Sequence, residues 1–430
     1  MSAHIDRQLL TRGFADVIVL LSEPIQTDVA AAGKPAPGEI APDGSAAAMA
    51  EGLAKHFTAP ERAQTSERNG AGPARRPRSM AAEMGDALPV PRVRLFPRLG
   101  VMLGTVDGEG LAGLSTDPRV KGVVGAPTTQ LLKPHRVAGA RMARTITWGI
   151  EDLGVPALWK QGLTGRGIRI GHLDTGVDGA HPAFRGAIDE FAEFDQCGRE
   201  VSPAPPAHDS DGHGTHTAGT IAGRAVRGVR IGVAPGARLV SGIVIEGGDL
   251  VARVLAGINW AIGHGIRILN LSLGLAGLSE DFVPLTRILR SRNILPVFAV
   301  GDHGANTSIA PGNNPKALSV GSYDQSGAVW LYSSSQRFRR KQDRVVPNLV
   351  GPGVGVLSAR PGGGFRFMSG TSMATPHIAG LAALLMEAKP GKTVDQVEAA
   401  IFRSCQLKPG TTADRAGLGV PNASRALALL

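Results

Sequence analysis

The sequence predicts an α/β fold: a mostly parallel β-sheet with helices on both faces, preceded by a small α/β domain. From about residue 148, short apolar runs alternate with longer helical stretches, the pattern of a parallel sheet covered on both sides. The strand-like runs lie at residues 168–173, 239–245, 266–273, 294–300 and 318–322. The helical stretches lie near residues 215–225, 250–263, 281–292, 372–388 and 394–404. In such sheets the functional residues gather at the carboxyl ends of the strands.

The chain before residue 130 has a different pattern of predicted strands and helices. A cluster of β-forming residues at 13–25, a strand-like segment at 93–104, a short helix at 108–115 and a strand at 120–126 indicate the small α/β domain. Between its two parts, the sequence is rich in Ala, Pro, Gly and Ser. We interpret this stretch as a low-complexity insert with one helix near residues 46–57.

Composition excludes some classes of partner. The 430 residues carry a net charge of +10 with a pI of about 10.1, but the basic residues are scattered and cluster only at 75–78 and 337–341. Aromatic residues make up only 4% and do not interleave with these clusters, as base stacking would need. We therefore expect no nucleic-acid partner.

Cysteine usage and the N-terminus bear on the compartment. Cys197 and Cys405 lack the spacing of a zinc site and could form at most one disulfide. The apolar run at residues 17–21 is too short for the core of a signal peptide, and no stretch approaches a membrane span. We expect no membrane partner, and either a cytoplasmic location or export by a route other than the Sec pathway.

Three segments place chemically useful side chains where a parallel sheet positions its site. Asp174 ends a predicted strand, His213 lies between glycines before a helix, and Ser372 begins a strongly apolar helix. Singly, each side chain could be an ordinary turn or helix cap. Together they fit a nucleophilic serine, a histidine that takes its proton, and a carboxylate that orients the histidine.

The sequence around these residues resembles the subtilisin family. Three segments of this chain resemble the active-site motifs of that family: DTGVDGAHP at 174–182, DGHGTHTAG at 211–219 and GTSMATPHIAG at 370–380. Supporting segments are GVAPGARL at 232–239, NLSLG at 270–274 and GPG at 351–353. The resemblance covers about residues 148–430. It implies a subtilisin-like fold and a serine endopeptidase that works through an acyl-enzyme, with Asp174, His213 and Ser372 as the triad and no cofactor.

The resemblance also implies residues that bind the polypeptide substrate. Two short segments would form the walls of the pocket for the residue before the scissile bond: Ser272, Leu273 and Gly274 on one side, and Ala299, Val300 and Gly301 on the other. Gly247 and Gly248 would form an edge on which substrate pairs as an added strand. For these two glycines, an ordinary tight turn is an equal alternative.

Two departures from the family pattern stand out. Where the family has an asparagine that donates to the oxyanion, this chain has Asp302, and an ionised carboxylate can only accept hydrogen bonds. Asp302 could donate as a neutral acid, Asn306 or His303 could substitute for it, or the enzyme could be slow. Many members of the family bind calcium at a site whose first ligand is an aspartate. This chain has Ala183 at that position and no carboxylate or amide in loop 223–232, so we expect no metal there.

The N-terminal region resembles a subtilisin propeptide, on residues 14–24 and 99–127. The implied domains are a propeptide-like domain (1–26 and 91–130), an insert (27–90), a linker with a possible processing site (131–147) and a catalytic domain (148–430). We expect a self-processing zymogen, monomeric, whose partners are its substrate and its own N-terminal region. An unrelated accessory domain is the alternative for that region. For the whole chain, the alternatives are a processing peptidase for one dedicated peptide precursor and a peptide-binding pseudoprotease impaired at Asp302.

Overall fold

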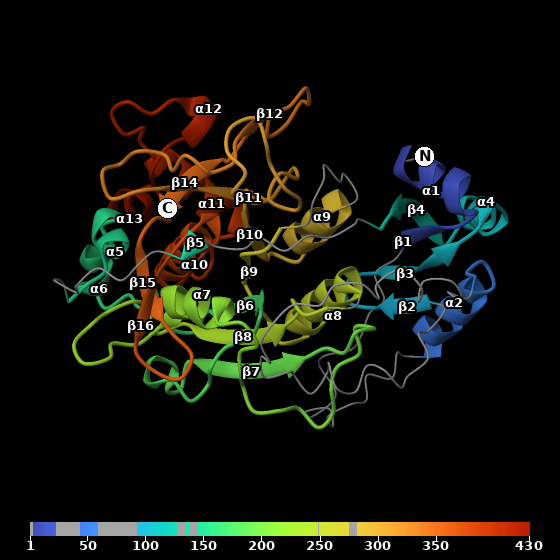
Figure 1. The fold of residues 1–430 in the computed structure, drawn as a ribbon, viewed down its shortest axis with the longest axis horizontal. Helices are drawn as coiled ribbons and strands as arrows, with labels where there is room; N and C mark the ends of the chain where they lie inside the picture. Colours follow the sequence, from blue (N-terminus) through green and yellow to red (C-terminus); the bar gives the residue numbers. More distant parts are fainter. Residues whose placement is uncertain are drawn as a thin grey trace. The chain divides into compact units, whose positions relative to one another are not determined.

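A computed structural model describes residues 3–22, 44–58, 93–126, 135–136, 145–247, 249–274 and 282–430 (Figure 1). The chain forms two compact units. The first contains Met1–Pro127, Glu193–Pro205 and Glu246–Gly263; the second contains Thr128–Ala192, Pro206–Ile245 and His264–Leu430.

The second unit is built on a seven-stranded sheet with the order β14-β11-β10-β9-β6-β8-β7. Its strands are β6 Arg169–Asp174, β7 Ile188–Glu193, β8 Arg238–Ile243, β9 Ile268–Leu271, β10 Leu295–Ala299, β11 Leu318–Tyr323 and β14 Leu349–Pro352. Pairing from β14 through to β8 is parallel throughout. The predicted α/β class with a largely parallel sheet is therefore confirmed.

Burial explains why these runs form strands. Every residue of β9, β10 and β11 is buried, as expected for central strands that are covered on both faces. β7, at the sheet edge, has the sequence IDEFAE and is only half buried along most of its length. An edge strand with acidic residues discourages pairing with another chain.

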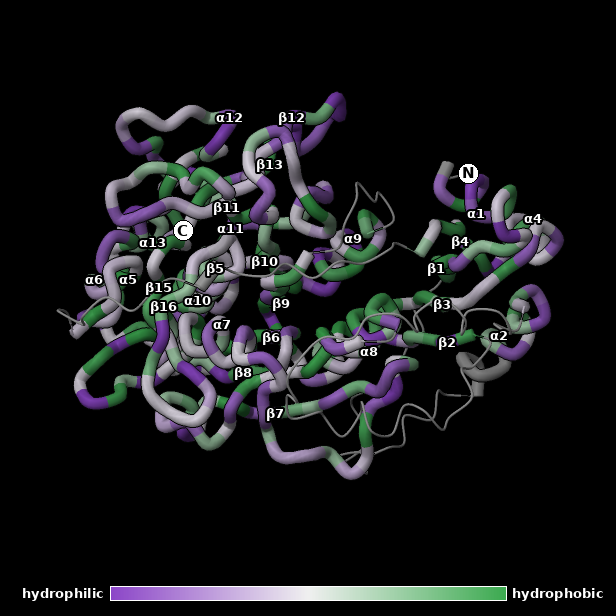
Figure 2. Tube along the Cα trace, in the orientation of Figure 1, coloured by the Kyte–Doolittle hydropathy of each residue, from purple (hydrophilic) through white to green (hydrophobic). Residues whose placement is uncertain are grey.

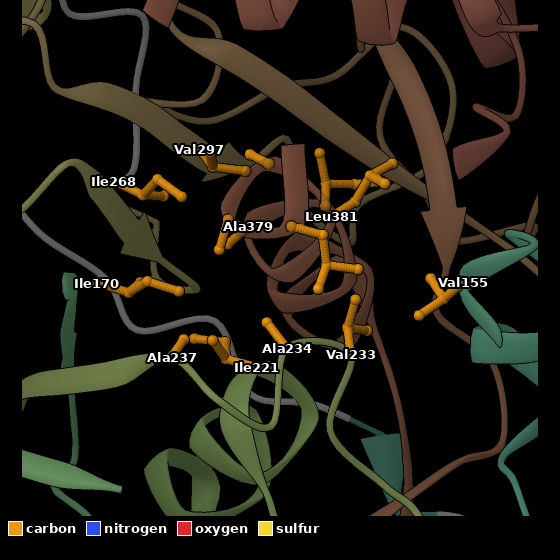
Figure 3. Packing of buried hydrophobic residues seen from close by; sticks show 14 of the residues in the cluster. Val155, Ile170, Ile221, Val233, Ala234, Ala237, Ile268, Val297, Ala379 and Leu381 are labelled. Atoms are coloured by element: carbon orange, nitrogen blue, oxygen red, sulfur yellow. The ribbon is translucent and has the colours of Figure 1, made fainter. Parts of the chain in front are cut away.

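Helix α10, Thr371–Ala388, is the central helix of this unit and is buried from Thr371 to Met386. It packs against β9, β10, β11 and β14, and beside it α7, His213–Ala222, packs against β6. Figure 3 shows this core from close by, with the α10 side chains of Ala379 and Leu381 between the sheet and the segment after α7. The labelled partners are Ile170, Ile268 and Val297 from the sheet and Ile221, Val233 and Ala234 from α7 and the segment after it.

Other elements of the second unit surround this core. A hairpin of β15, Val356–Ala359, and β16, Phe365–Ser369, leads directly into α10, and β5, His135–Arg136, pairs with β16 in antiparallel orientation. The helices are α5 Trp148–Asp152, α6 Val155–Trp159, α9 Val283–Ser291, α11 Val394–Ser404, α12 Ala413–Ala416 and α13 Ala423–Ala428, with the 3₁₀ turn Pro182–Phe184. A short hairpin joins β12, Gln336–Arg337, to β13, Val345–Val346. Figure 2 shows hydrophilic residues next to β12 and at α12, where Arg337 and Asp414 are exposed.

The first unit has an antiparallel four-stranded sheet with the order β2-β3-β1-β4. Its elements are α1 Ala3–Arg12, β1 Ala15–Leu21, α2 Gly44–Ala54, β2 Val93–Phe96, β3 Val101–Val106, α4 Gly108–Thr116, β4 Val120–Gly125 and α8 Leu250–Gly263. The segment predicted as one strand at 93–104 is two strands, because a turn at 97–100 separates β2 from β3. Leu53 and Phe57, from the predicted insert, are buried in the core with Val17 and Leu111. The rest of the predicted insert lies largely outside the described residues.

Candidate functional site

Three neighbouring strands end at residues that were predicted to carry the chemistry. β10, β9 and β6 are adjacent and parallel, so their carboxyl ends lie at one edge of the sheet. Asp174 is the last residue of β6, Ser272 directly follows β9, and Gly301 lies two residues after the end of β10. Helix α10 begins at the same edge, where the backbone N–H of Gly301 donates to the Thr371 hydroxyl at 3.3 Å.

Asp174 and His213 form a buried hydrogen-bonded pair. Nδ1 of His213 lies 2.7 Å from Oδ1 of Asp174, and both residues are almost completely buried. Asp174 accepts two more hydrogen bonds, from the backbone N–H of Thr175 at 2.7 Å and from the Thr217 hydroxyl at 3.1 Å. Nε2 of His213 is buried and has no hydrogen-bond partner among the described residues. The carboxylate thus orients the imidazole and leaves the second ring nitrogen available.

Two glycines allow this pair to form. Helix α7 begins at His213 itself, two residues earlier than predicted, because Gly212 takes a φ of +93° that turns the chain into the helix. At Gly214, a Cβ atom would lie 2.0 Å from the carbonyl oxygen of Gly176. Only glycine permits so close an approach of the segment after β6 to the start of α7.

The pKa values of the pair are displaced in opposite directions. Burial alone would raise the pKa of the Asp174 carboxyl, but the charge of His213 and its hydrogen bond outweigh burial, so the pKa is lowered. Burial alone would lower the pKa of His213, but the negative charge and hydrogen bond of Asp174 outweigh it, so the pKa is raised. His213 is therefore a stronger base than an isolated imidazole, which suits the acceptance of a proton from a hydroxyl.

Asp209 is a supporting residue that the sequence analysis missed. Its Oδ1 accepts hydrogen bonds from the Thr175 hydroxyl at 2.8 Å and from the Gly212 N–H at 2.7 Å. Its Oδ2 accepts from the N–H of Thr215 at 2.6 Å. One carboxylate thus ties the end of β6 to the first turn of α7. The signal in the sequence is an acidic residue four positions before His213.

Ser372 is the second residue of α10 and is fully buried. Its hydroxyl donates to the backbone carbonyl of Ser272 at 2.9 Å. The structure thus brings the predicted serine into contact with the predicted pocket segment, while Asp174 and His213 form a separate hydrogen-bonded pair. At the start of a helix the first N–H groups lack intrahelical acceptors, which makes this position electropositive.

Asp302 lies at this same helix N-terminus. Its Oδ1 accepts the backbone N–H of Thr371 at 2.8 Å, one residue before Ser372. Asp302 is half buried as a residue, with its Oδ2 atom buried, whereas His303 and Asn306, the alternatives considered for the donor, are exposed. A negative charge is favourable at a helix N-terminus, so the carboxylate helps to stabilise the start of α10.

The predicted pocket walls follow the same strand ends. All six residues are buried: Ser272, Leu273, Gly274, Ala299, Val300 and Gly301. Gly247, predicted to lie on the substrate edge, is exposed, and its carbonyl accepts a hydrogen bond from Arg253 Nη1 at 3.2 Å. Gly248 lies outside the described residues.

Neither a metal-binding cluster nor a membrane-spanning helix occurs among the described residues. No group of three or more His, Cys, Asp or Glu side chains in this part of the chain is arranged to hold a metal ion. Among the same residues, no helix combines the length and apolar character that a membrane span needs.

Known proteins share sequence similarity with this chain. The sequence profile of the subtilase family matches residues 165–422, more than half of the chain. M-protease of Shouchella clausii (strain KSM-K16) is 36% identical over 251 residues, which cover 58% of this chain and 62% of that protein. The match therefore spans less than two thirds of the length of M-protease.

Other relatives are matched over more of their length. Subtilisin BL of Lederbergia lenta is 36% identical over 250 residues, 58% of this chain and 87% of that protein. Alkaline elastase YaB of Bacillus sp. (strain YaB) is 31% identical over 333 residues, 77% of this chain and 80% of that protein. The second match is longer than the family profile, so the similarity is not confined to residues 165–422.

Proposed function

Because the chain belongs to the subtilase family, we propose that it is a serine endopeptidase that cleaves polypeptides through an acyl-enzyme, with Asp174, His213 and Ser372 as its triad. The observation that carries the proposal is the buried hydrogen bond of 2.7 Å between Asp174 and His213, which leaves Nε2 of the imidazole without a partner among the described residues. The names of the relatives, a protease, a subtilisin and an elastase, agree with this activity.

In the proposed reaction, the hydroxyl oxygen of Ser372 attacks the carbonyl carbon of the substrate and its proton passes to Nε2 of His213. Asp174 holds the imidazole in the required tautomer and stabilises the imidazolium. His213 then gives the proton to the departing amine, which leaves the acyl group on Ser372. Water, deprotonated by the same imidazole, hydrolyses the acyl-enzyme. The Ser372 hydroxyl must exchange its hydrogen bond with the Ser272 carbonyl for one with His213.

A serine-directed probe tests this activity. A fluorophosphonate should modify Ser372 and no other serine, because His213 activates only that hydroxyl. Ser372→Ala should abolish labelling and lower kcat by about 10⁶, the magnitude known for loss of a triad serine. Peptide mapping identifies the labelled residue. A folded wild type that binds peptides but resists the probe would instead indicate a pseudoprotease.

We also infer that the first 130 residues act as a propeptide, which is released by cleavage between residues 133 and 144. Two observations support this. β5, His135–Arg136, lies within this stretch and pairs with Met368 and Ser369 of β16, close in sequence to Ser372. In addition, the segment around β2 contacts α8 and the residue just before it, which belong to the proposed catalytic domain: Arg94 forms an ion pair with Asp249 at 2.6 Å, and the backbone N–H of Arg98 donates to Oδ1 of Asn259 at 2.8 Å.

Self-processing can be followed by intact mass and N-terminal sequencing. The purified wild type should shorten to a fragment of roughly 30 kDa, as expected from the proposed domain boundary. Ser372→Ala should stay at full length. Incubating this variant with a trace of wild type shows whether one molecule can cleave another. A fully active enzyme that retains the first 130 residues would exclude the propeptide role.

A further inference from the structure

A second histidine, His172, lies behind the proposed catalytic carboxylate. It is two residues before Asp174 on β6, so the two side chains project from the same face of the strand. Its neighbours on β8 and β9 in register are Ser241 and Asn270, and all three side chains are fully buried. Burying an imidazole in a central strand costs free energy unless its nitrogens are hydrogen-bonded. The triad itself does not require this residue.

Both nitrogens of His172 contact hydroxyl groups. Nδ1 lies 2.9 Å from the hydroxyl of Ser241, and Nε2 lies 2.9 Å from the hydroxyl of Thr217. Thr217 is on α7, four residues and one turn after His213. Its hydroxyl also lies 3.1 Å from Oδ2 of Asp174, whose other oxygen holds His213. Thr217 therefore connects His172 to the carboxylate.

The number of protons available on Thr217 and His172 determines which group donates in each of these hydrogen bonds. The Thr217 hydroxyl has a single proton, and its candidate acceptors are Oδ2 of Asp174, Nε2 of His172, and the backbone carbonyls of Gly214, at 3.1 Å, and His213, at 3.4 Å. The carboxylate is the only charged acceptor and therefore the strongest. If Thr217 donates to Asp174, its oxygen must accept from His172, which then carries its proton on Nε2. Nδ1 of His172 in turn accepts the proton of Ser241.

We propose that His172 is a positioning residue, whose Nε2–H directs the Thr217 hydroxyl onto Oδ2 of Asp174 and so fixes the carboxylate that orients His213. This inference rests on the proposed catalytic function. The chain of donors runs from Ser241 through His172 and Thr217 to Asp174, and each of its side chains is fully buried. By sharing the negative charge of Asp174, the Thr217 hydrogen bond also moderates the basicity of His213.

The surroundings keep His172 neutral. Burial lowers its pKa, and His213 lowers it further, although the charges of Asp174 and Asp209 act in the opposite direction. Its strand neighbours Ser241 and Asn270 carry no charge. The titratable groups that face His213 are Asp174, Asp209, Asp211, His172 and His216. Burial lowers the pKa of His216 to about 3, so that imidazole is also neutral at working pH.

An NMR experiment tests the directions of these hydrogen bonds without relying on activity. Imidazole ¹⁵N–¹H correlation spectra of full-length Ser372→Ala distinguish the two neutral tautomers, and the signals of His172 are assigned by their loss in His172→Gln. We expect His172 to be the Nε2–H tautomer and not to titrate between about pH 5 and 8. In Thr217→Val this preference should disappear. A protonated His172, or an Nδ1–H tautomer in Ser372→Ala, would overturn the proposal.

A kinetic experiment tests the consequence. Thr217→Val removes the hydroxyl at nearly constant volume and should lower kcat about tenfold, as expected for one hydrogen bond to a charged group, with KM little changed. Without its donor, the carboxylate favours the imidazolium more strongly, so the acid limb of the pH profile should move to higher pH.

The matched control is Thr220→Val. Thr220 lies on the same helix, is equally buried, and donates to the His216 carbonyl at 3.0 Å rather than to Asp174. It should leave the acid limb in place. Equal effects of the two variants would reduce Thr217 to a structural residue and refute the inference. If the wild type fails to react with the fluorophosphonate while the NMR result stands, the proposed function is wrong. The hydrogen-bond chain from Ser241 to Asp174 is then still correct.

Discussion

The two halves of the proposed site are built by different principles. In the acid–base half, Asp174 accepts hydrogen bonds from His213, Thr175 and Thr217, so both carboxylate oxygens are held. In the nucleophile half, the Ser372 hydroxyl donates to the Ser272 carbonyl and Asp302 accepts the N–H of Thr371. The first half already has its hydrogen bonds in place, whereas the proposed reaction requires the second to exchange the hydrogen bond between Ser372 and Ser272.

This difference teaches where stability and catalysis conflict. A carboxylate at the N-terminus of α10 stabilises the helix, because it meets unpaired N–H groups and the positive end of the dipole. The same carboxylate contacts Thr371, the residue before Ser372, and in the proposed reaction negative charge develops on the substrate beside Ser372 in the transition state. In the acid–base half no such conflict exists, since the charge of Asp174 both satisfies its donors and stabilises the imidazolium.

The largest expected effect is that of Asp174→Asn, which dismantles the acid–base half. Asparagine favours the wrong tautomer of His213, so kcat should fall by about 10⁴. The pH profile should change as well. His213 must be neutral to act, and its raised pKa places the acid limb of the wild type above the ordinary value of 6.5. Without the charge of Asp174, burial dominates and the limb should move to lower pH.

The measurement is kcat/KM against pH with a peptide substrate. Circular dichroism and thermal unfolding show whether the variant is folded. If the acid limb of Asp174→Asn stays where it is in the wild type, the group that titrates is not His213.

A smaller effect, in the opposite direction, is expected from Asp302→Asn in the nucleophile half. The amide oxygen can still accept the Thr371 N–H, and the amide nitrogen adds a donor that never ionises. At neutral pH we expect kcat to rise about 10²-fold, which is roughly the contribution of one oxyanion-hole donor. Single-turnover kinetics should show the gain in the acylation step.

Asp302→Ala is the control, because it removes the charge without supplying a donor. It should gain less than Asp302→Asn and lose about 1 kcal/mol of stability with the lost cap. Equal gains in both variants would mean that repulsion alone limits the wild type. A fall in kcat for Asp302→Asn would show that Asp302 does not occupy the oxyanion position.

The fold was largely predictable because its central strands are buried on both faces. Continuous apolar runs marked β6, β8, β9, β10 and β11. The prediction missed β7, whose half-exposed, acidic sequence lacks such a run, and the short strands β14 to β16. It also treated Leu53 and Phe57 as part of an insert, since surrounding low-complexity sequence hides two residues that enter the N-terminal core.

The site was predictable only for residues with distinctive motifs. Asp174, His213 and Ser372 stand in recognisable segments, and the structure brings the first two into contact. Asp209 and His172 went unnoticed, because their roles depend on which segments meet in three dimensions. His172 left one signal, a titratable side chain in the middle of a buried central strand, between the apolar residues Ile170 and Leu173.

The smallest changes in the pH profile are expected from substitution of two aspartates near His213. The negative charges of Asp209 and Asp211 both raise the pKa of His213, so Asp209→Asn and Asp211→Asn should each move the acid limb to lower pH. They differ in structure. Asp209 accepts hydrogen bonds from Thr175, Gly212 and Thr215, and an asparagine cannot accept at both ends. Asp211 is exposed, and its backbone N–H donates to Asp209.

Asp209→Asn should therefore also lower the plateau of kcat above the acid limb, by about tenfold, because the first turn of α7 loses its link to the end of β6. Asp211→Asn should keep the wild-type plateau. The comparison separates charge from positioning, because both substitutions remove one negative charge from the same loop. If both plateaus stay at the wild-type level, Asp209 contributes only its charge, and the rigidity of the acid–base half comes from Asp174 and its remaining donors alone.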